Sequence, residues 1–347
     1  MSGAAVAVPS DRLLGLDHNE RLFPAPDLIP LLARVPATAL TRYPDMKGLE
    51  RRLARLWGVG TDRVLATGGA DDAIDRICRR YLSGGREMVT VVPTFGMMTT
   101  FARLAGGRVC EIPTLDDPAP LAPTLDRLGD RTGLVTVISP HNPTGQVVPP
   151  PRMLDIAERL PGGAMLLADL AYAEFADRDP TEALLGRDNI LVVRTLSKAW
   201  GLAGLRVGYV LGSPAAIAAL RASGPPFPVA GPSIWLAERA LDLGDRVTAD
   251  YVSAVRSERA RLRVALRDWG AEPFPSEANF VLASTRRAAM LERRFRRSGI
   301  AVRRFPNSPD LVRITLPGDE ATFRRLLAVL AVGPRPRVRR SAERGVP

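Results

Sequence analysis

The sequence has 347 residues, of which 46% are hydrophobic and 24% charged, so its composition is that of a folded globular protein rather than a disordered one. At about 150 residues per domain, this length predicts two domains, or one large α/β domain with an appendage. No apolar run approaches the roughly 18 residues that a membrane helix needs, and no basic residue precedes the short apolar patch at the N-terminus. We therefore expect a cytoplasmic protein that does not insert into a membrane.

The formal charge of +11 comes almost entirely from arginine, because Lys47 and Lys198 are the only lysines among 48 basic residues. These arginines are scattered and aromatic residues make up 5%, whereas nucleic-acid binders concentrate basic charge beside aromatics or on one helix face. We therefore expect no nucleic-acid partner. The two cysteines and two histidines lack the spacing of metal ligands, so we expect no metal site.

Four segments are predicted in chain order. Residues 1–44 lack a strong period and are expected to form an N-terminal arm or lid that contributes to the small domain. Residues 45–230 alternate β-branched runs with helical patterns such as Asp71–Tyr81 and Pro151–Leu160, which predicts a large α/β domain with a mostly parallel sheet. Its expected strands are Arg63–Ala66, Met88–Val92, Arg108–Ile112, Leu134–Ile138, Met165–Ala168, Ile190–Arg194 and Val207–Leu211.

After a proline-rich crossing, the pattern changes to long helices, the strand-like ANFVLAS and LVRITL, and a last helix at Glu320–Val332. This predicts a small C-terminal α+β domain over residues 231–333. Residues 334–347 hold five arginines and one glutamate and are expected to form a flexible basic tail.

The most informative motif is TLSKAWGLAGLRVGY at residues 195–209, which follows the apolar strand pattern NILVVR. It contains Lys198, one of the two lysines of the chain. Arginine stays protonated at working pH, whereas a lysine amine can lose its proton and act as a nucleophile. A surface lysine fits poorly within this run of small and apolar residues. We therefore predict a chemical function for Lys198.

Three further motifs follow predicted strands, and open parallel sheets bind ligands at the carboxyl ends of their strands. SPHNPTG at residues 139–145 combines Pro, Asn and Gly in a sharp turn. In LLADLAY, Asp169 ends an apolar strand, where a carboxylate needs a cation or hydrogen-bond donors. The strand, glycine turn and helix at ATGGADDA offer free backbone N–H groups to a phosphate, although helices commonly start this way.

In this order and spacing, the four motifs resemble those of the fold-type I enzymes that use pyridoxal 5'-phosphate. Within them the chain is similar to the class I and II aminotransferases, specifically the histidinol-phosphate aminotransferase group, from LDHNE at residue 16 to RITLP ending at residue 317. The resemblance implies the PLP-dependent transferase fold of type I, with a large, mostly parallel domain and a small α+β domain. It also implies amino transfer between an amino acid and an oxo acid or oxo-phosphate, in amino-acid biosynthesis or specialised secondary metabolism.

The resemblance implies a role for each matching residue. Lys198, Asp169 and Tyr172 would be the catalytic residues: Lys198 forms the internal aldimine and carries the proton between the substrate Cα and the cofactor C4′, and Asp169 pairs with the pyridine nitrogen. Asn142 and Tyr172 would hydrogen-bond the phenolic oxygen, and Phe95 would stack on the ring. The residues expected around the cofactor phosphate are Gly69, Ala70, Asp71, Thr195, Ser197 and Arg206.

The resemblance also implies contacts with the substrate and with a partner subunit. Arg313 in LVRITLP would clamp the substrate carboxylate or phosphate, and Arg303 would be a second substrate-side cation. Asn19 falls in an N-terminal segment that covers the substrate. Tyr43 in TRYPD matches a tyrosine that reaches the cofactor phosphate of the neighbouring subunit, which implies a homodimer with shared active sites.

Departures from the family pattern concern the substrate side. The N-terminal motif reads DHNER where Asn-Glu-Asn-Pro is usual, PTFGMM lacks a tyrosine, Leu170 replaces an acid, and His141, which we expect to pack, replaces an asparagine. Two other activities on the same fold stay open: a decarboxylase similar to threonine-phosphate decarboxylase, and an amino-acid cyclase. A transcription regulator with this domain as effector sensor is not expected, because too little chain precedes the motifs for a DNA-binding domain.

Overall fold

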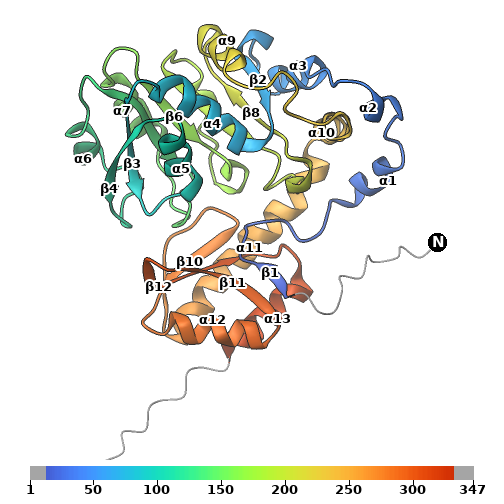
Figure 1. Cartoon of the computed structure of the whole chain (residues 1–347). Coiled ribbons are helices and arrows are strands. Elements are labelled where there is room, and N and C mark those ends of the chain that lie inside the picture. Colours follow the sequence, from blue (N-terminus) through green and yellow to red (C-terminus); the bar gives the residue numbers. More distant parts are fainter. Residues whose placement is uncertain (1–12, 332–347) are drawn as a thin grey trace, which may run out of the picture.

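A seven-stranded sheet forms the centre of the large domain in the computed structural model, which describes residues 13–331 (Figure 1). The strands lie in the order β2-β8-β7-β6-β5-β3-β4, and β8 is antiparallel to both of its neighbours while the other pairs are parallel. Their bounds are β2 Val64–Thr67, β3 Glu87–Val92, β4 Arg108–Pro113, β5 Thr132–Ile138, β6 Met165–Asp169, β7 Ile190–Thr195 and β8 Gly208–Leu211. The predicted mostly parallel sheet and its seven strands are confirmed.

Apolar side chains cover both faces of this sheet, as the continuous hydrophobic runs of its strands require. Along β5, Val135 and Val137 belong to one core cluster, and Leu134 and Ile138 belong to another. The helices of the first cluster are α3 Lys47–Leu56, α7 Pro150–Glu158, α8 Thr181–Leu184 and α10 Gly231–Leu243, with α6 Leu121–Leu125 at its edge. The helices of the second are α4 Gly69–Leu82, α5 Gly96–Leu104 and α9 Pro214–Ala222, and α4 buries Cys78.

The small domain is built on a five-stranded sheet in the order β1-β11-β12-β10-β9. Its elements are β1 Leu14–Leu16, α11 Asp245–Trp269, β9 Glu272–Pro273, β10 Phe280–Ser284, α12 Ala288–Arg297, β11 Ile300–Phe305, β12 Ser308–Thr315 and α13 Glu320–Ala331. Strand β1 pairs in parallel with β11, with Leu14 opposite Ile300. The sequence pattern did not predict β1, because a strand of three residues is too short to show alternation.

The change from the large to the small domain comes later than the predicted boundary between residues 230 and 231. Helix α10 packs on α3, since Ile234, Ala237 and Ala240 belong to the core of the large domain. In α11, Val247 still belongs to that core, whereas Tyr251 already belongs to the core of the small domain. The boundary therefore lies inside a continuous helix, where composition gives no indication of it.

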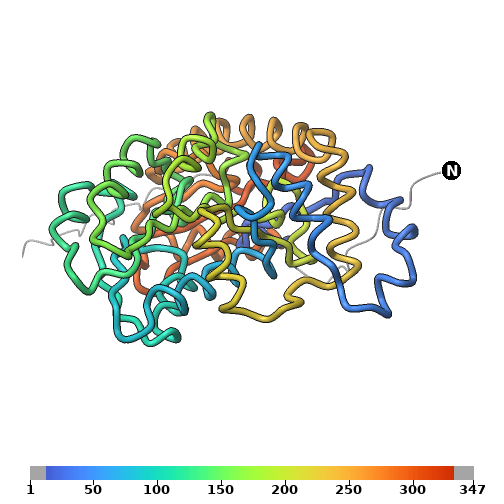
Figure 2. Tube along the Cα trace, turned by 90° about the horizontal axis from the view of Figure 1, so that it is seen from above, coloured from blue at the N-terminus to red at the C-terminus, as the bar shows by residue number. Residues whose placement is uncertain are grey.

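The N-terminal arm leaves β1 and reaches the large domain before α3 (Figure 1). It holds the short helices η1 Pro26–Leu28, α1 Ile29–Leu32 and α2 Thr38–Thr41; the other 3-10 helices are η2 Thr61–Arg63, η3 Ala173–Phe175 and η4 Ala203–Leu205. Seen from above, the blue arm lies at the opposite side of the molecule from the green segment around α6 and α7 (Figure 2). Within residues 13–331 no helix is long and apolar enough to cross a membrane. The predicted basic tail lies outside the described residues.

Candidate active site

A cavity of about 220 Å³ lies at the carboxyl ends of the parallel strands of the large domain. The turns after β2, β3, β5, β6 and β7 supply most of its lining, as open parallel sheets do for their ligands. The lining residues are Ala70, Asp71, Phe95, Asn142, Asp169, Ala171, Tyr172, Thr195, Ser197, Lys198 and Arg206. All of these except Ala171 were predicted as cofactor-binding, so the fold brings together residues from five separate turns.

The N-terminus of α4 forms one wall of the cavity. Gly69, in the first turn of this helix, has a φ of +83°, which favours glycine. A Cβ atom at Gly69 would lie 2.7 Å from Arg206 Nη2, and a Cβ at Gly208 would lie 2.5 Å from the carbonyl carbon of Gly69. Two glycines therefore allow β8 and the guanidinium of Arg206 to approach the free N–H groups at the start of the helix, where anions bind.

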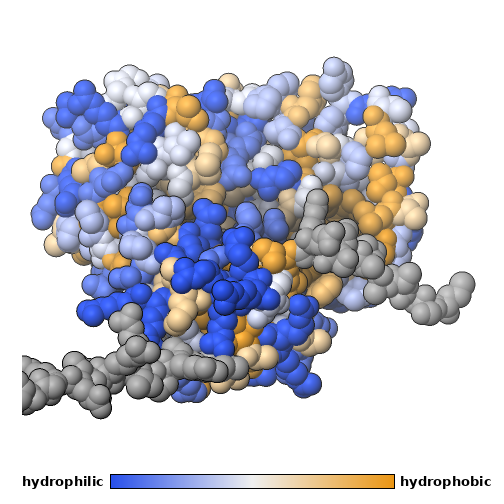
Figure 3. All heavy atoms as spheres, turned by 60° about the horizontal axis from the view of Figure 1, so that its bottom comes forward, coloured by the Kyte–Doolittle hydropathy of each residue, from blue (hydrophilic) through white to orange (hydrophobic). Residues whose placement is uncertain are grey.

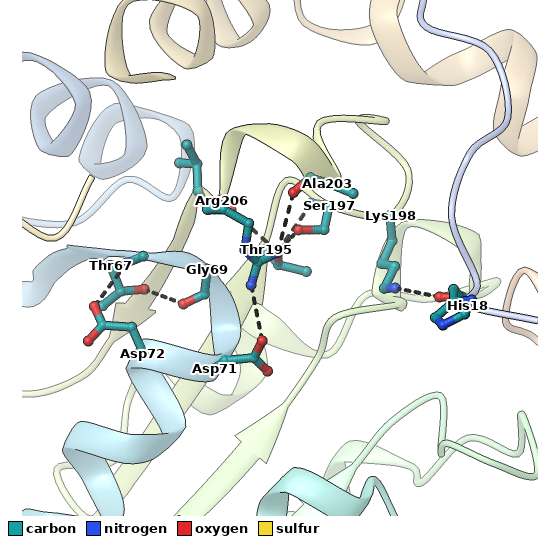
Figure 4. Close-up of polar contacts among 12 residues, drawn as sticks. His18, Thr67, Gly69, Asp71, Asp72, Thr195, Ser197, Lys198, Ala203 and Arg206 are labelled. Carbon is teal, nitrogen blue, oxygen red and sulfur yellow. Dashed lines mark hydrogen bonds and ion pairs between the residues drawn. The ribbon is translucent and has the colours of Figure 1, made fainter. Parts of the chain in front are cut away.

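Hydroxyl groups and a cation complete this wall. Thr195 Oγ1 lies 2.9 Å from Ser197 Oγ, and Arg206 Nη2 donates to Asp71 Oδ2 at 3.0 Å (Figure 4). Arg206 itself has a φ of +53°, which turns its backbone between η4 and β8. Arginine matches the geometry of phosphate oxygens. Together with the helix N-terminus, these groups can hold a phosphate.

Asp169 is the last residue of β6 and is 4% exposed. Its Oδ1 accepts a hydrogen bond from the backbone N–H of Ala171 at 3.1 Å, and it forms no ion pair with any residue from 13 to 331. Burial raises the pKa of the Asp169 carboxyl to about 6, against the effect of the hydrogen bond from Ala171. A buried carboxylate in this state favours a cationic partner in the cavity.

Lys198 points its amine toward the N-terminal arm. Its Nζ donates to the backbone carbonyls of His18 at 3.3 Å and Asn19 at 3.2 Å (Figure 4). The same nitrogen lies 5.6 Å from the ring centroid of Tyr172. The arm therefore lies against the amine of Lys198.

Arg313 enters the site from β12 of the small domain. Its Nη1 donates to Asn142 Oδ1 at 2.6 Å, and its Nη2 donates to the carbonyl of Asp17 at 2.8 Å. The side chain is buried, its Nε has no hydrogen-bond partner, and it has no carboxylate partner among residues 13–331. Burial, followed by repulsion from Arg303, lowers the pKa of this guanidinium. The structure thus places an uncompensated cation at the cavity edge.

Other predicted site residues lie outside the cavity. Asn19 is buried beside it, with its side chain on Tyr172 and Thr315. Arg303 is exposed and stands opposite Arg313 in the register of β11 and β12. Tyr43 is 85% exposed and stacks on Phe227 with a centroid distance of 4.9 Å. The predicted contacts of these three residues with substrate, or with a partner's cofactor, remain predictions.

His141 packs in the turn after β5, as the sequence predicted. Its Nδ1 lies 3.0 Å from Thr144 Oγ1, and burial lowers the pKa of the imidazole to about 4. A histidine that stays neutral at working pH supports the turn that carries Asn142.

Sequence reasoning missed some residues at the site. Ala171 lines the cavity and supports Asp169 through its backbone, and an alanine gives no sequence indication of such a contact. Thr315 and Asn279 hold the Asn19 backbone from the small domain. Thr315 lies in the RITLP motif and Asn279 lies near the start of the predicted strand ANFVLAS, so polar residues at strand ends could have suggested both.

The sequence profile of the family described as aminotransferase class I and II matches residues 12–330. The chain belongs to the class I and II aminotransferases. This membership confirms the predicted fold, the enzyme class and the dependence on pyridoxal phosphate.

Named relatives of this aminotransferase share most of its length. The histidinol-phosphate aminotransferase of Xanthomonas euvesicatoria pv. vesicatoria (strain 85-10) is 36% identical over 310 residues, which cover 85% of each chain. That of Xylella fastidiosa (strain Temecula1) is 34% identical over 344 residues, covering 95% of this chain and 92% of the relative. Among solved structures, histidinol-phosphate aminotransferase from Sinorhizobium meliloti in complex with pyridoxal-5'-phosphate has a TM-score of 0.84 and 27% identity, covering 92% of each chain.

Proposed function

We propose that this aminotransferase moves an amino group between an amino acid donor and an oxo-phosphate substrate of the histidinol-phosphate class. The observation that carries the proposal is two buried charges without an ion-pair partner among residues 13–331: the Asp169 carboxyl, which lines the cavity, and the Arg313 guanidinium, which donates to Asn142 of the cavity lining. Buried charges are unstable without counter-charges. A cationic ring nitrogen and an anionic substrate group supply both.

The residues of the cavity fit pyridoxal phosphate. The close approach of Gly208 and Gly69 leaves the N–H groups of α4 open to the phosphate, and Asp169 suits a protonated pyridine nitrogen. Asn142 and Tyr172 supply polar groups for the phenolic oxygen, and Phe95 supplies an aromatic face for the ring. When bound, the cofactor supplies an electron sink for negative charge at the substrate Cα.

Lys198 moves the proton in this proposal. As a free amine, Lys198 Nζ would take the proton from the substrate Cα, and as an ammonium it would give that proton back, so the transfer would consume no net proton. Arg313, whose two terminal nitrogens donate to the oxygens of Asn142 and Asp17, would bind the carboxylate of the amino acid donor and, in turn, the phosphate of the oxo-phosphate substrate.

Arg303 is proposed as a second cation for the phosphate of the oxo-phosphate substrate. This side chain lines a second cavity of about 430 Å³ with Arg296 and Arg304, next to Asp17 of the arm. Asn19 belongs to the same arm, which we propose covers the substrate. The names of the relatives support an oxo-phosphate substrate, and the altered DHNER segment is where this chain's specificity would differ.

We also propose that the active unit is a homodimer with shared sites in the cytoplasm. The exposed apolar residues of the arm favour a partner, since Ile29, Leu32 and Leu40 are each more than half exposed. Orange hydrophobic residues gather at the right edge of Figure 3, the side on which α1 and α2 lie in Figure 1. Cell fractionation would test the location.

The function is tested with purified protein loaded with pyridoxal phosphate. Borohydride reduction and peptide mapping should find the pyridoxyl group on Lys198, and label on Lys47 would contradict the assignment. A screen of amino donors and oxo acceptors should then give turnover with an oxo-phosphate. An amino donor alone should convert the cofactor to its pyridoxamine form. Release of CO₂ or formation of a cyclic product without that conversion would instead support a decarboxylase or a cyclase.

A further inference from the structure

Asn19 lies in the N-terminal arm and connects this arm with both domains through its four polar groups, the backbone N–H and C=O and the side-chain Oδ1 and Nδ2. Its Nδ2 donates to the Tyr172 hydroxyl at 3.0 Å, and its backbone N–H donates to Thr315 Oγ1 at 3.1 Å. Its Oδ1 accepts from Thr315 Oγ1 at 3.0 Å, and its backbone oxygen accepts from Asn279 Nδ2 at 3.1 Å and from Lys198 Nζ at 3.2 Å. Tyr172 and Lys198 belong to the large domain, whereas Thr315 and Asn279 belong to the small one. Asn19 is 1% exposed, so water does not compete for these contacts.

The hydroxyl of Thr315 fixes which way the Asn19 amide faces. This hydroxyl accepts from the backbone N–H of Asn19, so its own single proton is free to be donated to Asn19 Oδ1. The amide oxygen must then face Thr315, and the NH₂ group must face Tyr172. In the hydrogen bond between Asn19 and Tyr172, the amide Nδ2 is therefore the donor and the tyrosine hydroxyl oxygen is the acceptor.

We propose that Asn19 and Thr315 are positioning residues that direct the proton of the Tyr172 hydroxyl into the cavity. A tyrosine hydroxyl has one proton. Because Asn19 Nδ2 donates to the Tyr172 oxygen, this nitrogen cannot accept the proton of that hydroxyl. The proton can be donated only elsewhere, and Tyr172 lines the cavity. This inference rests on the proposed function, because the acceptor it prepares for is the phenolic oxygen of pyridoxal phosphate.

The backbone of Asn19 adds a second positioning effect. Its φ of +57° is one of two positive values among non-glycine residues from 13 to 331. Asparagine tolerates this conformation better than most residues. In this conformation the carbonyl accepts hydrogen bonds from both Asn279 and Lys198, so the small domain holds the acceptor that orients the lysine amine. Tyr172 and Lys198 are thus aimed by the same residue.

Three variants test the direction of the tyrosine proton. In Asn19→Asp, an ionised carboxylate can only accept, so the Tyr172 hydroxyl would donate to residue 19 and turn its proton away from the cavity. Thr315→Val has the same shape but no hydroxyl, and it frees the amide to reverse without a change in charge. Thr315→Ser keeps the hydroxyl and is the matched control. Tyr172→Phe sets the limit of the effect.

The readouts are the dissociation constant of pyridoxal phosphate, titrated into ligand-free protein, and the pH midpoint of the visible absorbance of the loaded protein. We expect Asn19→Asp and Thr315→Val to weaken binding about 3- to 10-fold, the effect of one hydrogen bond, and to raise the pH midpoint toward that of Tyr172→Phe. The midpoint rises because a phenolic oxygen without its donor holds a shared proton to higher pH. Thr315→Ser should stay within about twofold of the wild type.

Each outcome decides the inference. Wild-type midpoints in both Asn19→Asp and Thr315→Val, with a shifted midpoint in Tyr172→Phe, would overturn it. Equal losses in Thr315→Val and Thr315→Ser would show that only packing at residue 315 matters, which also overturns it. If Thr315→Val does not fold, Asn19→Asp decides alone, because it keeps the backbone contacts. Wild-type protein that fails to bind pyridoxal phosphate would instead contradict the proposed function.

Discussion

At Asp169, folding and function make opposite demands on one side chain. The carboxyl is buried at the end of β6 with a single hydrogen bond, which raises its pKa to about 6. An acid with a raised pKa binds its proton more tightly in the folded state than in the unfolded state. Stability of the ligand-free protein therefore falls as the pH rises from the ordinary value of 3.8 to about 6, and stays low above it.

We expect Asp169→Asn to stabilise the ligand-free protein and to reduce its activity. Above pH 7 the free energy of unfolding should rise by up to about 3 kcal/mol, because the amide has no charge to bury and still accepts from Ala171. The gain should vanish near pH 4. The transamination rate should fall about 100-fold or more. Urea titrations at several pH values and rate measurements check both, and a rate near that of the wild type would remove the electron-sink argument.

The buried carboxyl of Glu258, away from the cavity, leads to a similar prediction about how stability depends on pH. Glu258 lies on α11 with Oε2 accepting from the N–H of Gly318 at 2.8 Å, while Oε1 has no hydrogen-bond partner within the described part of the chain, residues 13–331. Burial raises the pKa of this carboxyl to about 7. Stability should therefore fall as the pH rises from 4.5 to about 7, and Glu258→Gln should remove part of that fall. Thermal melts of both proteins at pH 5 and pH 8 measure it, and parallel curves would contradict the prediction.

At the scale of single residues, much of the candidate site can be predicted, because its chemistry needs side-chain types that few other residues can replace. A lysine among arginines, and an acid ending an apolar strand, stand out without a structure. Backbone groups do not, and the carbonyls of Asp17 and His18 are invisible in a sequence although they hold Arg313 and Lys198. Thr315 could not be connected with Asn19, since nothing in either motif indicates that the two meet.

Between elements, the close contact of β8 with the start of α4 shapes the wall of the cavity where we propose that the phosphate binds. The backbone of Gly208 lies against Gly69 and Ala70, and no side chain fits between them. Helix and strand therefore meet at van der Waals distance, and the free N–H groups stay directed at the cavity.

Gly208→Ala should weaken the binding of pyridoxal phosphate by about 10-fold or more, because its Cβ would lie 2.5 Å from the carbonyl carbon of Gly69 and push the helix away. Gly162→Ala is the matched control, since a Cβ there has nothing within 4 Å. Fluorescence titration with the cofactor measures the effect. Equal affinities of the two variants would show that the α4 terminus does not depend on this contact.

Helices and strands could be predicted where the sequence has a clear hydrophobic pattern. Features without such a pattern could not be predicted. Most strands of the large sheet are short runs rich in apolar and β-branched residues, such as ILVVRT in β7, and the sequence shows these runs directly. Strand β1 has three residues, and the domain boundary falls within α11, whose helical pattern continues through it. Both features depend on contacts between residues far apart in the chain.

At the scale of the whole molecule, Tyr43 is the residue on which the expectation of a homodimer rests. Its ring is exposed and stacks on the half-exposed Phe227, so much of its surface stays available for contact with a partner subunit. The fold itself does not bring it to the cavity of its own chain.

If Tyr43 reaches a partner's cofactor phosphate, Tyr43→Phe should weaken cofactor binding by about 0.5–1.5 kcal/mol, the net contribution of one hydrogen bond. Mixing inactive Tyr43→Ala protomers with inactive Lys198→Ala protomers should then restore one sound site per heterodimer. Activity after verified subunit exchange is the measurement. No recovery would show that each site is built from one chain.

The pairing of β1 with β11 also affects how the protein is made. Leu14 leaves the ribosome early, but its partner Ile300 emerges only when nearly all of the chain has been synthesised. The strands of the large sheet, residues 64–211, are complete well before then and can pair first. We therefore expect the arm to close over Lys198 as one of the last steps of folding, and the amine of Lys198 to be exposed in the nascent chain until that step.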